Sequence, residues 1–135
     1  MKKIAVAVGV IERSNGDILI AKRHQHLHQG GKWEFPGGKV EAGESTLSAL
    51  SRELIEEVSL TVIDATPFML IEHDYGDKVV TLDILHVKSF EGDAHSNEGQ
   101  EIKWVAKDEL ANYEFPAANL AIIEQLNSNS SATQV

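Results

Sequence analysis

Runs of apolar residues broken by polar turns divide the chain into short segments with the character of strands. Residues 4–11 and 18–22 are rich in β-branched and aliphatic side chains, and the Ser-Asn-Gly-Asp segment between them, residues 14–17, is a strong turn signal. The chain is therefore expected to open with a β-hairpin. Later apolar segments are expected to form strands as well, at residues 62–73, 79–90 and 101–105.

Other segments have the spacing of an amphipathic helix. Good helix formers follow Ser45, a residue suited to the N-cap, as far as residue 58, and apolar side chains recur among them at i, i+3, i+7 and i+11. A second helix is expected over residues 117–126. On the first helix the apolar side chains would form one buried stripe, made of Leu47, Leu50, Leu54 and Val58.

Strands interrupted by one central and one terminal helix predict an α/β layered domain with a mixed β-sheet and helices on its faces. At 135 residues and 42% hydrophobic content, the chain has the size and composition of one globular domain, which we expect at residues 1–127. Residues 128–135 are mostly Ser, Thr, Asn and Gln, and we expect a disordered tail there.

The charge of the chain limits what it binds. A formal net charge of −9 argues against stable binding to nucleic acid or to an anionic membrane, because both need a basic face. No apolar run approaches the ~20 residues that span a bilayer, and the absence of cysteine agrees with a cytoplasmic, monomeric protein. A polyphosphate substrate would also be repelled, so we expect divalent cations held by carboxylates to supply the positive charge.

One face of the first helix gathers carboxylates. Glu53, Glu56 and Glu57 lie at i, i+3 and i+4, within one arc of roughly 100° that is separate from the apolar stripe. Like charges on adjacent turns repel, so we expect Arg52 to bridge to Glu56 and a hard cation, Mg²⁺ or Mn²⁺, to take carboxylate oxygens. Taken alone, such a patch is most often a solvated helix face.

The residues that precede this helix make the pattern much more specific. Gly37 and Gly38 let the backbone approach a ligand closely, and Glu44 lies just before the helix N-terminus. Gly38, five residues, Glu44, seven residues and then Arg-Glu-Leu-Ile-Glu-Glu-Val-Ser-Leu at 52–60 resemble the Nudix box. Only the last glycine of the box differs. Ser59 stands there, where left-handed backbone is common, and should cost roughly 1 kcal/mol or change the turn.

Within the Nudix family the whole chain except its tail resembles the MutT-type 8-oxo-dGTP diphosphatases. The resemblance is carried by residues 7–9, 21–23, 33–39, 97–100 and 115–119. It implies a Nudix-like α/β/α sandwich with a mixed β-sheet between helices. It also implies a Mg²⁺-dependent pyrophosphohydrolase that converts 8-oxo-dGTP to 8-oxo-dGMP and pyrophosphate, which removes a cause of replication errors from the nucleotide pool.

The same resemblance implies roles for individual residues. Glu53 is the first choice for the general base, and Glu98 is an alternative base or an additional ligand. The full catalytic set would be Glu53, Glu98, Arg52 and Glu44. The metal would be held by the Gly37 carbonyl and by carboxylates, namely Glu53, Glu56, Glu57 and Glu98. The nucleotide would contact Arg23, His28, Glu34, Phe35, Pro36, Gly37, Lys78 and Asn119.

Asn119 would read the oxidised base. Oxidation at C8 turns N7 from an acceptor into an N–H donor, so an amide oxygen can accept from N7 while the amide nitrogen donates to O6. Without the resemblance, Asn119 is equally well explained as the N-cap of the last helix. Lys78 stands where the family can place an arginine, and its point charge does not reproduce a guanidinium fork, so its role stays open.

Other interpretations stay open as well. Without the resemblance Glu98 belongs to a surface turn, and the alternating His24, His26 and His28 fit a solvated loop better than a metal cluster. The proline and glycines of residues 33–38 predict an irregular loop. Alternative functions are a Nudix hydrolase of another nucleotide, such as a pyrimidine triphosphate or ADP-ribose, and a non-catalytic nucleotide-binding sensor. Sensors can lose box carboxylates, and this chain retains Glu44, Glu53, Glu56 and Glu57.

Overall fold

The computed structural model of the protein describes residues 2–26 and 30–132, with side chains up to residue 128. In this range a four-stranded sheet has the order β4-β1-β6-β5, and a three-stranded sheet has the order β3-β2-β7. Strands β1 and β6 are parallel and the other pairs are antiparallel, so the larger sheet is mixed. The strands are β1 (Lys2–Ile11), β2 (Ile18–Lys22), β3 (Trp33–Glu34), β4 (Gly37–Lys39), β5 (Thr61–Asp74), β6 (Lys78–Glu91) and β7 (Ile102–Val105).

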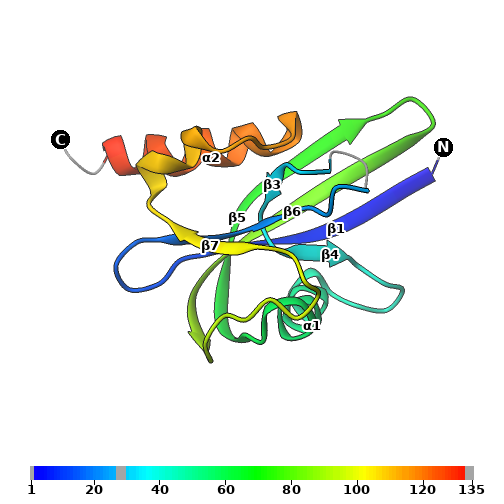
Figure 1. The fold of residues 1–135 in the computed structure, drawn as a ribbon. Coiled ribbons are helices and arrows are strands. Elements are labelled where there is room, and N and C mark those ends of the chain that lie inside the picture. The colour runs from blue at the N-terminus through cyan, green and yellow to red at the C-terminus, as the bar shows by residue number, and fades with distance from the viewer. Residues whose placement is uncertain (1, 27–29, 133–135) are drawn as a thin grey trace.

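Helices cover the sheets from two sides (Figure 1). Helix α1 (Thr46–Val58) lies below the sheets in this view and helix α2 (Ala117–Ala132) lies above them. A short 3-10 helix, η1 (Lys107–Asn112), leads from β7 towards α2 and was not predicted. The predicted α/β/α sandwich with a mixed sheet is therefore confirmed. No helix in the described residues is long and apolar enough to cross a membrane.

Strand β1 contributes to the core on both of its faces. Val8 and Val10 pack in the hydrophobic cluster that includes Ile122 of α2. Ala7 and Ile11, on the opposite face, pack in the cluster that includes the buried leucines of α1. Because helices cover both faces, β1 reads in the sequence as a continuous apolar run and does not alternate with polar residues.

The predicted opening hairpin is wrong beyond its turn. Residues 14–17 do turn the chain, and a single bridge joins Glu12 to Ile18. After this bridge, however, β1 and β2 separate into different sheets. The segment of residues 33–39 explains the separation, because its first part pairs with β2 as β3 and its last part pairs with β1 as β4.

Residues 33–38 were expected to be irregular and instead contribute two short strands. Pro36 lies between β3 and β4, where its missing N–H removes no hydrogen bond from either strand pair, and its carbonyl accepts from the Gly9 N–H at 2.8 Å. The diverging strands and the segment that crosses between them create the space in which a ligand cavity can form.

Helix α1 begins as predicted, with Ser45 as N-cap accepting from the Ser48 N–H at 3.1 Å. Its buried face differs from the predicted stripe. The side chain of Leu47 is 46% exposed, whereas Ala49 is buried. Helix α1 packs against β1, β4 and β5, and Leu47, in its first turn, is the one leucine of the stripe that this packing leaves exposed.

Ser59 keeps the turn that a glycine would make. Its φ of 62° and ψ of 30° are left-handed, and its N–H donates to the Ile55 carbonyl, which ends α1 in the usual way. Of the predicted alternatives, a strained serine or a changed turn, the structure has the serine in the left-handed conformation.

Helix α2 is longer than predicted. It continues to Ala132, so residues 128–132 of the expected tail are helical, and residues 133–135 lie outside the described residues. The helix is anchored by buried Ile122, Ile123 and Leu126, and propagation past an anchored segment costs little per residue. The Asn127 side chain donates to the Ile123 carbonyl at 3.1 Å and supports this extension.

The burial of α1 predicts unequal effects of truncating its leucines. Leu54→Ala should lower the free energy of unfolding by about 2–5 kcal/mol, because Leu54 is fully buried. Leu47→Ala, the matched control, should change it by less than about 0.5–1 kcal/mol. Urea unfolding followed by circular dichroism measures both, and equal losses would contradict the packing of α1 described above.

Candidate active site

Strand β4 lies close to β1 at Gly37 and close to α1 at Gly38. A Cβ on Gly38 would lie 2.3 Å from the carboxyl carbon of Glu53, and a Cβ on Gly37 would lie 2.0 Å from the Ala7 carbonyl oxygen. The Gly37 N–H donates to Glu57 Oε2 at 3.1 Å. The two glycines therefore bring the β4 backbone directly against the carboxylates of α1.

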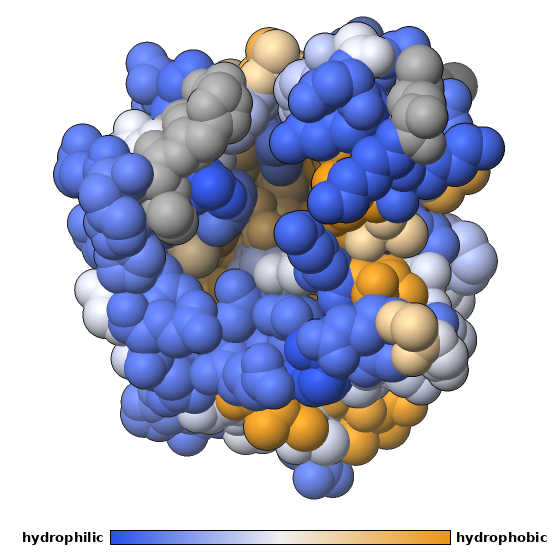
Figure 2. Space-filling view, turned by 90° about the vertical axis from the view of Figure 1, so that its right-hand side faces the viewer, coloured by the Kyte–Doolittle hydropathy of each residue, from blue (hydrophilic) through white to orange (hydrophobic). Residues whose placement is uncertain are grey.

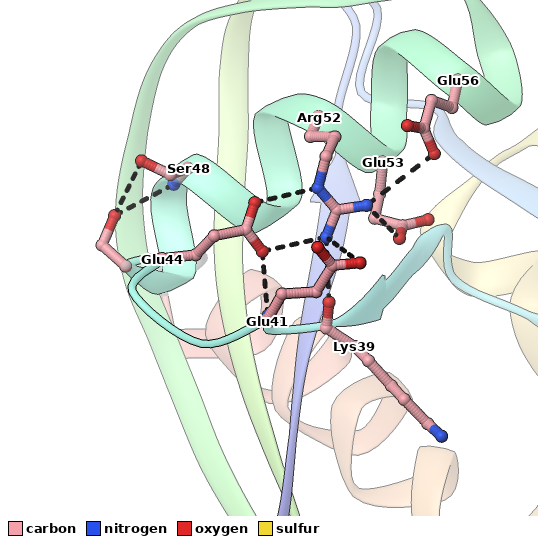
Figure 3. A network of polar contacts seen from close by, with 8 residues as sticks. Lys39, Glu41, Glu44, Ser48, Arg52, Glu53 and Glu56 are labelled. Atoms are coloured by element: carbon pink, nitrogen blue, oxygen red, sulfur yellow. Dashed lines mark hydrogen bonds and ion pairs between the residues drawn. The ribbon is translucent and has the colours of Figure 1, made fainter.

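Arg52 holds several acidic groups around the start of α1 (Figure 3). Its Nε and Nη2 donate to the two carboxylate oxygens of Glu44, both at 2.9 Å, and its Nη1 donates to Glu53 Oε1 at 2.9 Å. Nη2 also donates to the Lys39 carbonyl at 3.1 Å, which ties β4 to the helix. The predicted bridge to Glu56 is confirmed as an ion pair, which at 3.8 Å is longer than the bonds to Glu44 because the fork of the guanidinium faces Glu44.

The network leaves Glu44 strongly acidic. The hydrogen bonds from Arg52 and a further bond from the Glu41 N–H lower the pKa of Glu44 to about 2, and the same pairing raises the pKa of Arg52. Neither Arg52 nor Glu44 is among the described residues that line the cavity. Arg52 bonds to Glu53, and Glu44 accepts from the Glu41 N–H in the loop before α1, so the pair links this loop to the Glu53 carboxylate.

Other carboxylates of the site are less acidic than usual. Burial, followed by the charges of Glu53 and Glu98, raises the pKa of Glu57 to about 8. Burial also raises the pKa of Glu53, against the opposing effect of Arg52. The side chain of Glu56, 57% exposed, faces solvent more than either. Burial and the crowding of Glu53, Glu57 and Glu98 therefore disfavour the charged forms of Glu53 and Glu57.

Glu57 and Glu98 line a cavity of about 390 Å³, whereas Glu53 and Glu56 are not among its described lining residues. Apolar side chains form part of its lining, from Val6 and Val8 of β1, Leu82 of β6 and Phe35. Figure 2 shows a hollow with hydrophilic residues around its mouth and hydrophobic surface inside. The remaining lining residues are Lys22, Arg23, His24, Glu34, Gly37, Gly38, Lys39, Gln100 and Asn119.

Residues 7–125 match the NUDIX domain family. The chain belongs to this family. It is 39% identical to the 8-oxo-dGTP diphosphatase of Escherichia coli K12, over 93% of this chain and 98% of the relative. It is 35% identical to the CTP pyrophosphohydrolase of the same organism, over 92% of this chain and 91% of the relative. A solved MutT structure, from work on Aliivibrio salmonicida and Vibrio cholerae, aligns with a TM-score of 0.86 at 42% identity, covering 95% of this chain and 99% of that one.

The Nudix fold brings most of the predicted nucleotide contacts to the cavity. Arg23 and Glu34 line it and form an ion pair at 2.9 Å. Phe35 also lines it, although its ring is only 4% exposed and stacks on Phe115 with centroids 5.2 Å apart. Asn119 lines the cavity from the first turn of α2, which begins at Ala117, so Asn119 is not the N-cap of this helix.

Other predicted contacts lie elsewhere. Lys78 is not among the described residues that line the cavity; it begins β6 opposite Lys2, with its ammonium 5.5 Å from the centre of the Tyr75 ring. Pro36 contributes its carbonyl to Gly9 and is likewise absent from the described lining. His28 lies outside the described residues.

The lining includes residues that sequence reasoning did not select. Lys22, His24 and Lys39 bring basic groups to the cavity, and Gln100 adds an amide. The sequence does indicate that Val6 and Val8 lie on the same face of β1, since side chains two residues apart on a strand share one face. It gives a weaker indication that Lys22, His24 and Lys39 line the cavity. Each lies at or just beyond the end of a short strand, β2 or β4, where a functional side chain is often presented.

The donor groups of this Nudix site suit a hard divalent cation. Among the described residues, no group of three or more His, Asp or Glu side chains is arranged to hold a metal ion. The carboxylates are engaged by protein donors instead, Glu53 by Arg52 and Glu57 by the Gly37 N–H. Carboxylate and carbonyl oxygens are the ligands that Mg²⁺ prefers, and a cation would favour the charged forms of these crowded carboxylates.

The Arg52 network predicts a pH-dependent contribution to stability. The pKa of Glu44 in the folded protein lies below its ordinary value of 4.5. Its pairing therefore stabilises the fold fully above that pH, and the contribution is lost as the pH falls towards 2. NMR titration should find Glu44 near pH 2 in the native protein and closer to 4.5 in Arg52→Lys. Arg13→Lys, which changes an arginine paired with Asp17, should leave it near 2. A native Glu44 that titrates near 4.5 would rule out this network.

Proposed function

We propose that this Nudix hydrolase converts 8-oxo-dGTP to 8-oxo-dGMP and pyrophosphate with Mg²⁺, as a monomer in the cytoplasm. The observation that carries the proposal is that one cavity joins Asn119, an apolar lining and the acidic end of the Nudix helix. The E. coli relative that is 39% identical over nearly its whole length bears the name 8-oxo-dGTP diphosphatase, which supports the same substrate.

Asn119 is the proposed base-reading residue. Its amide oxygen accepts from the N7–H that only the oxidised base has, and its amide nitrogen donates to O6. Normal guanine would place an N7 acceptor against the amide oxygen, and burying such an unpaired acceptor is costly. The apolar side chains of Val6, Val8 and Leu82 provide surface for the face of the purine.

The acidic side of the cavity is the proposed reaction centre. Nudix hydrolases use divalent metal ions, and here the ion would be held by Glu53, Glu56, Glu57, Glu98 and the Gly37 carbonyl. When bound, it neutralises the charge that develops on phosphate oxygens. Lys22, Arg23 and Lys39 line the same cavity and attract the triphosphate. His28 is proposed as a further contact.

The proposed reaction is attack of water on the β-phosphorus. Glu53 takes a proton from this water, with Glu98 as the alternative base, and Arg52 holds the Glu53 carboxylate in place at 2.9 Å. The bond between the β-phosphorus and the α–β bridging oxygen breaks. The bridging oxygen leaves with the nucleoside monophosphate, and pyrophosphate carries the oxygen of the attacking water.

A pyrimidine triphosphate is the second candidate substrate. It is favoured by the 35% identity to a protein named CTP pyrophosphohydrolase, over 92% of this chain and 91% of that relative.

Pyrophosphate release with Mg²⁺ separates the candidates. The substrates to compare are 8-oxo-dGTP, dGTP, CTP, dCTP and ADP-ribose. We expect kcat/KM for 8-oxo-dGTP to exceed that for dGTP by several orders of magnitude, since sites built around a polar contact discriminate by roughly 10⁴–10⁵. Equal values for these two would remove the proposed selectivity. A preference for CTP would favour the second candidate, and no turnover of any substrate would refute the hydrolase.

Two substitutions test the residue assignments. Asn119→Ala should lower the preference for 8-oxo-dGTP over dGTP by at least about tenfold, whereas Asn112→Ala, on the exposed surface of η1, should leave it unchanged. Glu53→Gln should lower kcat by about 10²–10⁴, and the exposed Glu109→Gln should not lower it. A Glu53→Gln enzyme with unchanged kcat would exclude Glu53 as the base.

A further inference from the structure

The loop between β6 and β7 encloses the C-terminal end of the Nudix helix. An α-helix leaves its last four carbonyls without partners inside the helix. Here the Asn97 N–H donates to the Glu57 carbonyl at 3.0 Å, and the His95 N–H donates to the Val58 carbonyl at 2.9 Å. The Asn97 side chain adds a bond from Nδ2 to the Glu56 carbonyl at 3.1 Å. The loop therefore satisfies carbonyls that the helix cannot satisfy itself.

Ser59 extends this contact beyond what a glycine would allow. Its hydroxyl accepts from Asn97 Nδ2 at 2.8 Å, which is the shortest of the bonds that this nitrogen makes. The loop also approaches closely at Gly92, where a Cβ would lie 2.9 Å from the Ser59 carbonyl oxygen. Ser59, which stands where the Nudix box has glycine, thus supplies a hydrogen-bond acceptor for the neighbouring loop, although serine is less favourable than glycine in the left-handed conformation.

The residue after Asn97 in this loop lies at the candidate active site. Glu98 follows Asn97 and lines the cavity together with Glu57, although Glu98 itself is exposed. An exposed carboxylate beside a like charge lowers its energy by turning into solvent. The backbone at Glu98 cannot move away from the cavity with the side chain, because the neighbouring Asn97 is bonded to the Glu57 and Glu56 carbonyls at the end of α1.

We propose that Asn97 is a positioning residue that holds Glu98 at the reaction centre, with the Ser59 hydroxyl as its anchor on the helix. The inference rests on the proposed function, in which Glu98 is a base or a metal ligand. A helix cap with a purely structural role would stabilise α1 and have no particular relation to Glu98. The two roles predict different effects of replacing Asn97 in an enzyme whose Glu98 has already been replaced.

A double-mutant cycle distinguishes the two roles. Asn97→Ala and Glu98→Gln are each compared with the native enzyme and with the double variant, by kcat and KM for 8-oxo-dGTP. Asn97→Ala should lower kcat by about tenfold or more, since small displacements of a reacting group have effects of this size or larger. In the Glu98→Gln background the same change should lower kcat by less than about twofold. Additive losses would refute the positioning role.

Binding of Mn²⁺ without nucleotide gives a readout that does not depend on turnover. Titration followed by electron paramagnetic resonance should show weaker Mn²⁺ binding in Asn97→Ala and in Glu98→Gln, with no further weakening in the double variant. If the native protein hydrolyses none of the nucleotides, the proposed function fails while this titration still tests the positioning of Glu98. Native-like Mn²⁺ affinity and kcat in Asn97→Ala would overturn the inference.

Two more variants separate positioning from stability. Ser59→Gly removes the hydroxyl acceptor and relieves the left-handed serine, so it should lower kcat by on the order of twofold without lowering Tm. Asn127→Ala is the matched control, because this side chain also donates to a helix carbonyl, at 3.1 Å, but on α2 away from the described lining of the cavity. It should leave kcat and Mn²⁺ binding unchanged. A Ser59→Gly enzyme with higher Tm and native kcat would remove Ser59 from the proposal.

Discussion

The close approach of β4 to the carboxylate face of α1 is the constraint on which the rest of the site depends. A Cβ at residue 38 would displace the Glu53 carboxylate from its place, and a Cβ at residue 37 would overlap the Ala7 backbone of β1, which lies on the other edge of β4 from this contact. The contact also requires a cation at the junction, and Arg52 supplies one by bonding to Glu44, Glu53 and the Lys39 carbonyl together. Sequence positions that look independent in the Nudix box are therefore parts of one contact.

This contact determines how the charge of the site is distributed. Arg52 bonds to Glu44 and Glu53, which are not among the described lining residues, and the structure describes no contact from it to Glu57 or Glu98, which line the cavity. Burial and neighbouring carboxylates raise the pKa of Glu57 to about 8, so a cation beside it would favour its ionised form. The same cavity is lined by apolar side chains and by Asn119.

Much of this was predictable from local patterns, and what was missed depends on tertiary pairing. The Ser45 cap, α1, the long strands and the segregation of acidic from apolar residues follow from periodicity and residue preference. The separation of β1 from β2 does not, because a turn signal says nothing about which partners the strands take later. Leu47 has the spacing of the buried leucines but lies in the first turn of α1, and periodicity does not show how far along a helix the packing extends. Lys78 was assigned by resemblance, and only its position in β6 shows that it lies away from the described lining.

The raised pKa values of Glu53 and Glu57 show that gathering carboxylates from α1 and the following loop has an electrostatic cost, which a divalent cation would relieve. The most direct test is the thermal stability of the nucleotide-free protein with increasing Mg²⁺, at constant ionic strength maintained with a monovalent salt. We expect Mg²⁺ to raise Tm in a saturable way, because an ion that binds only the folded protein stabilises it, and we expect Glu57→Gln to remove most of the increase. A Tm that does not respond to Mg²⁺, or responds equally in Glu57→Gln, would contradict this expectation.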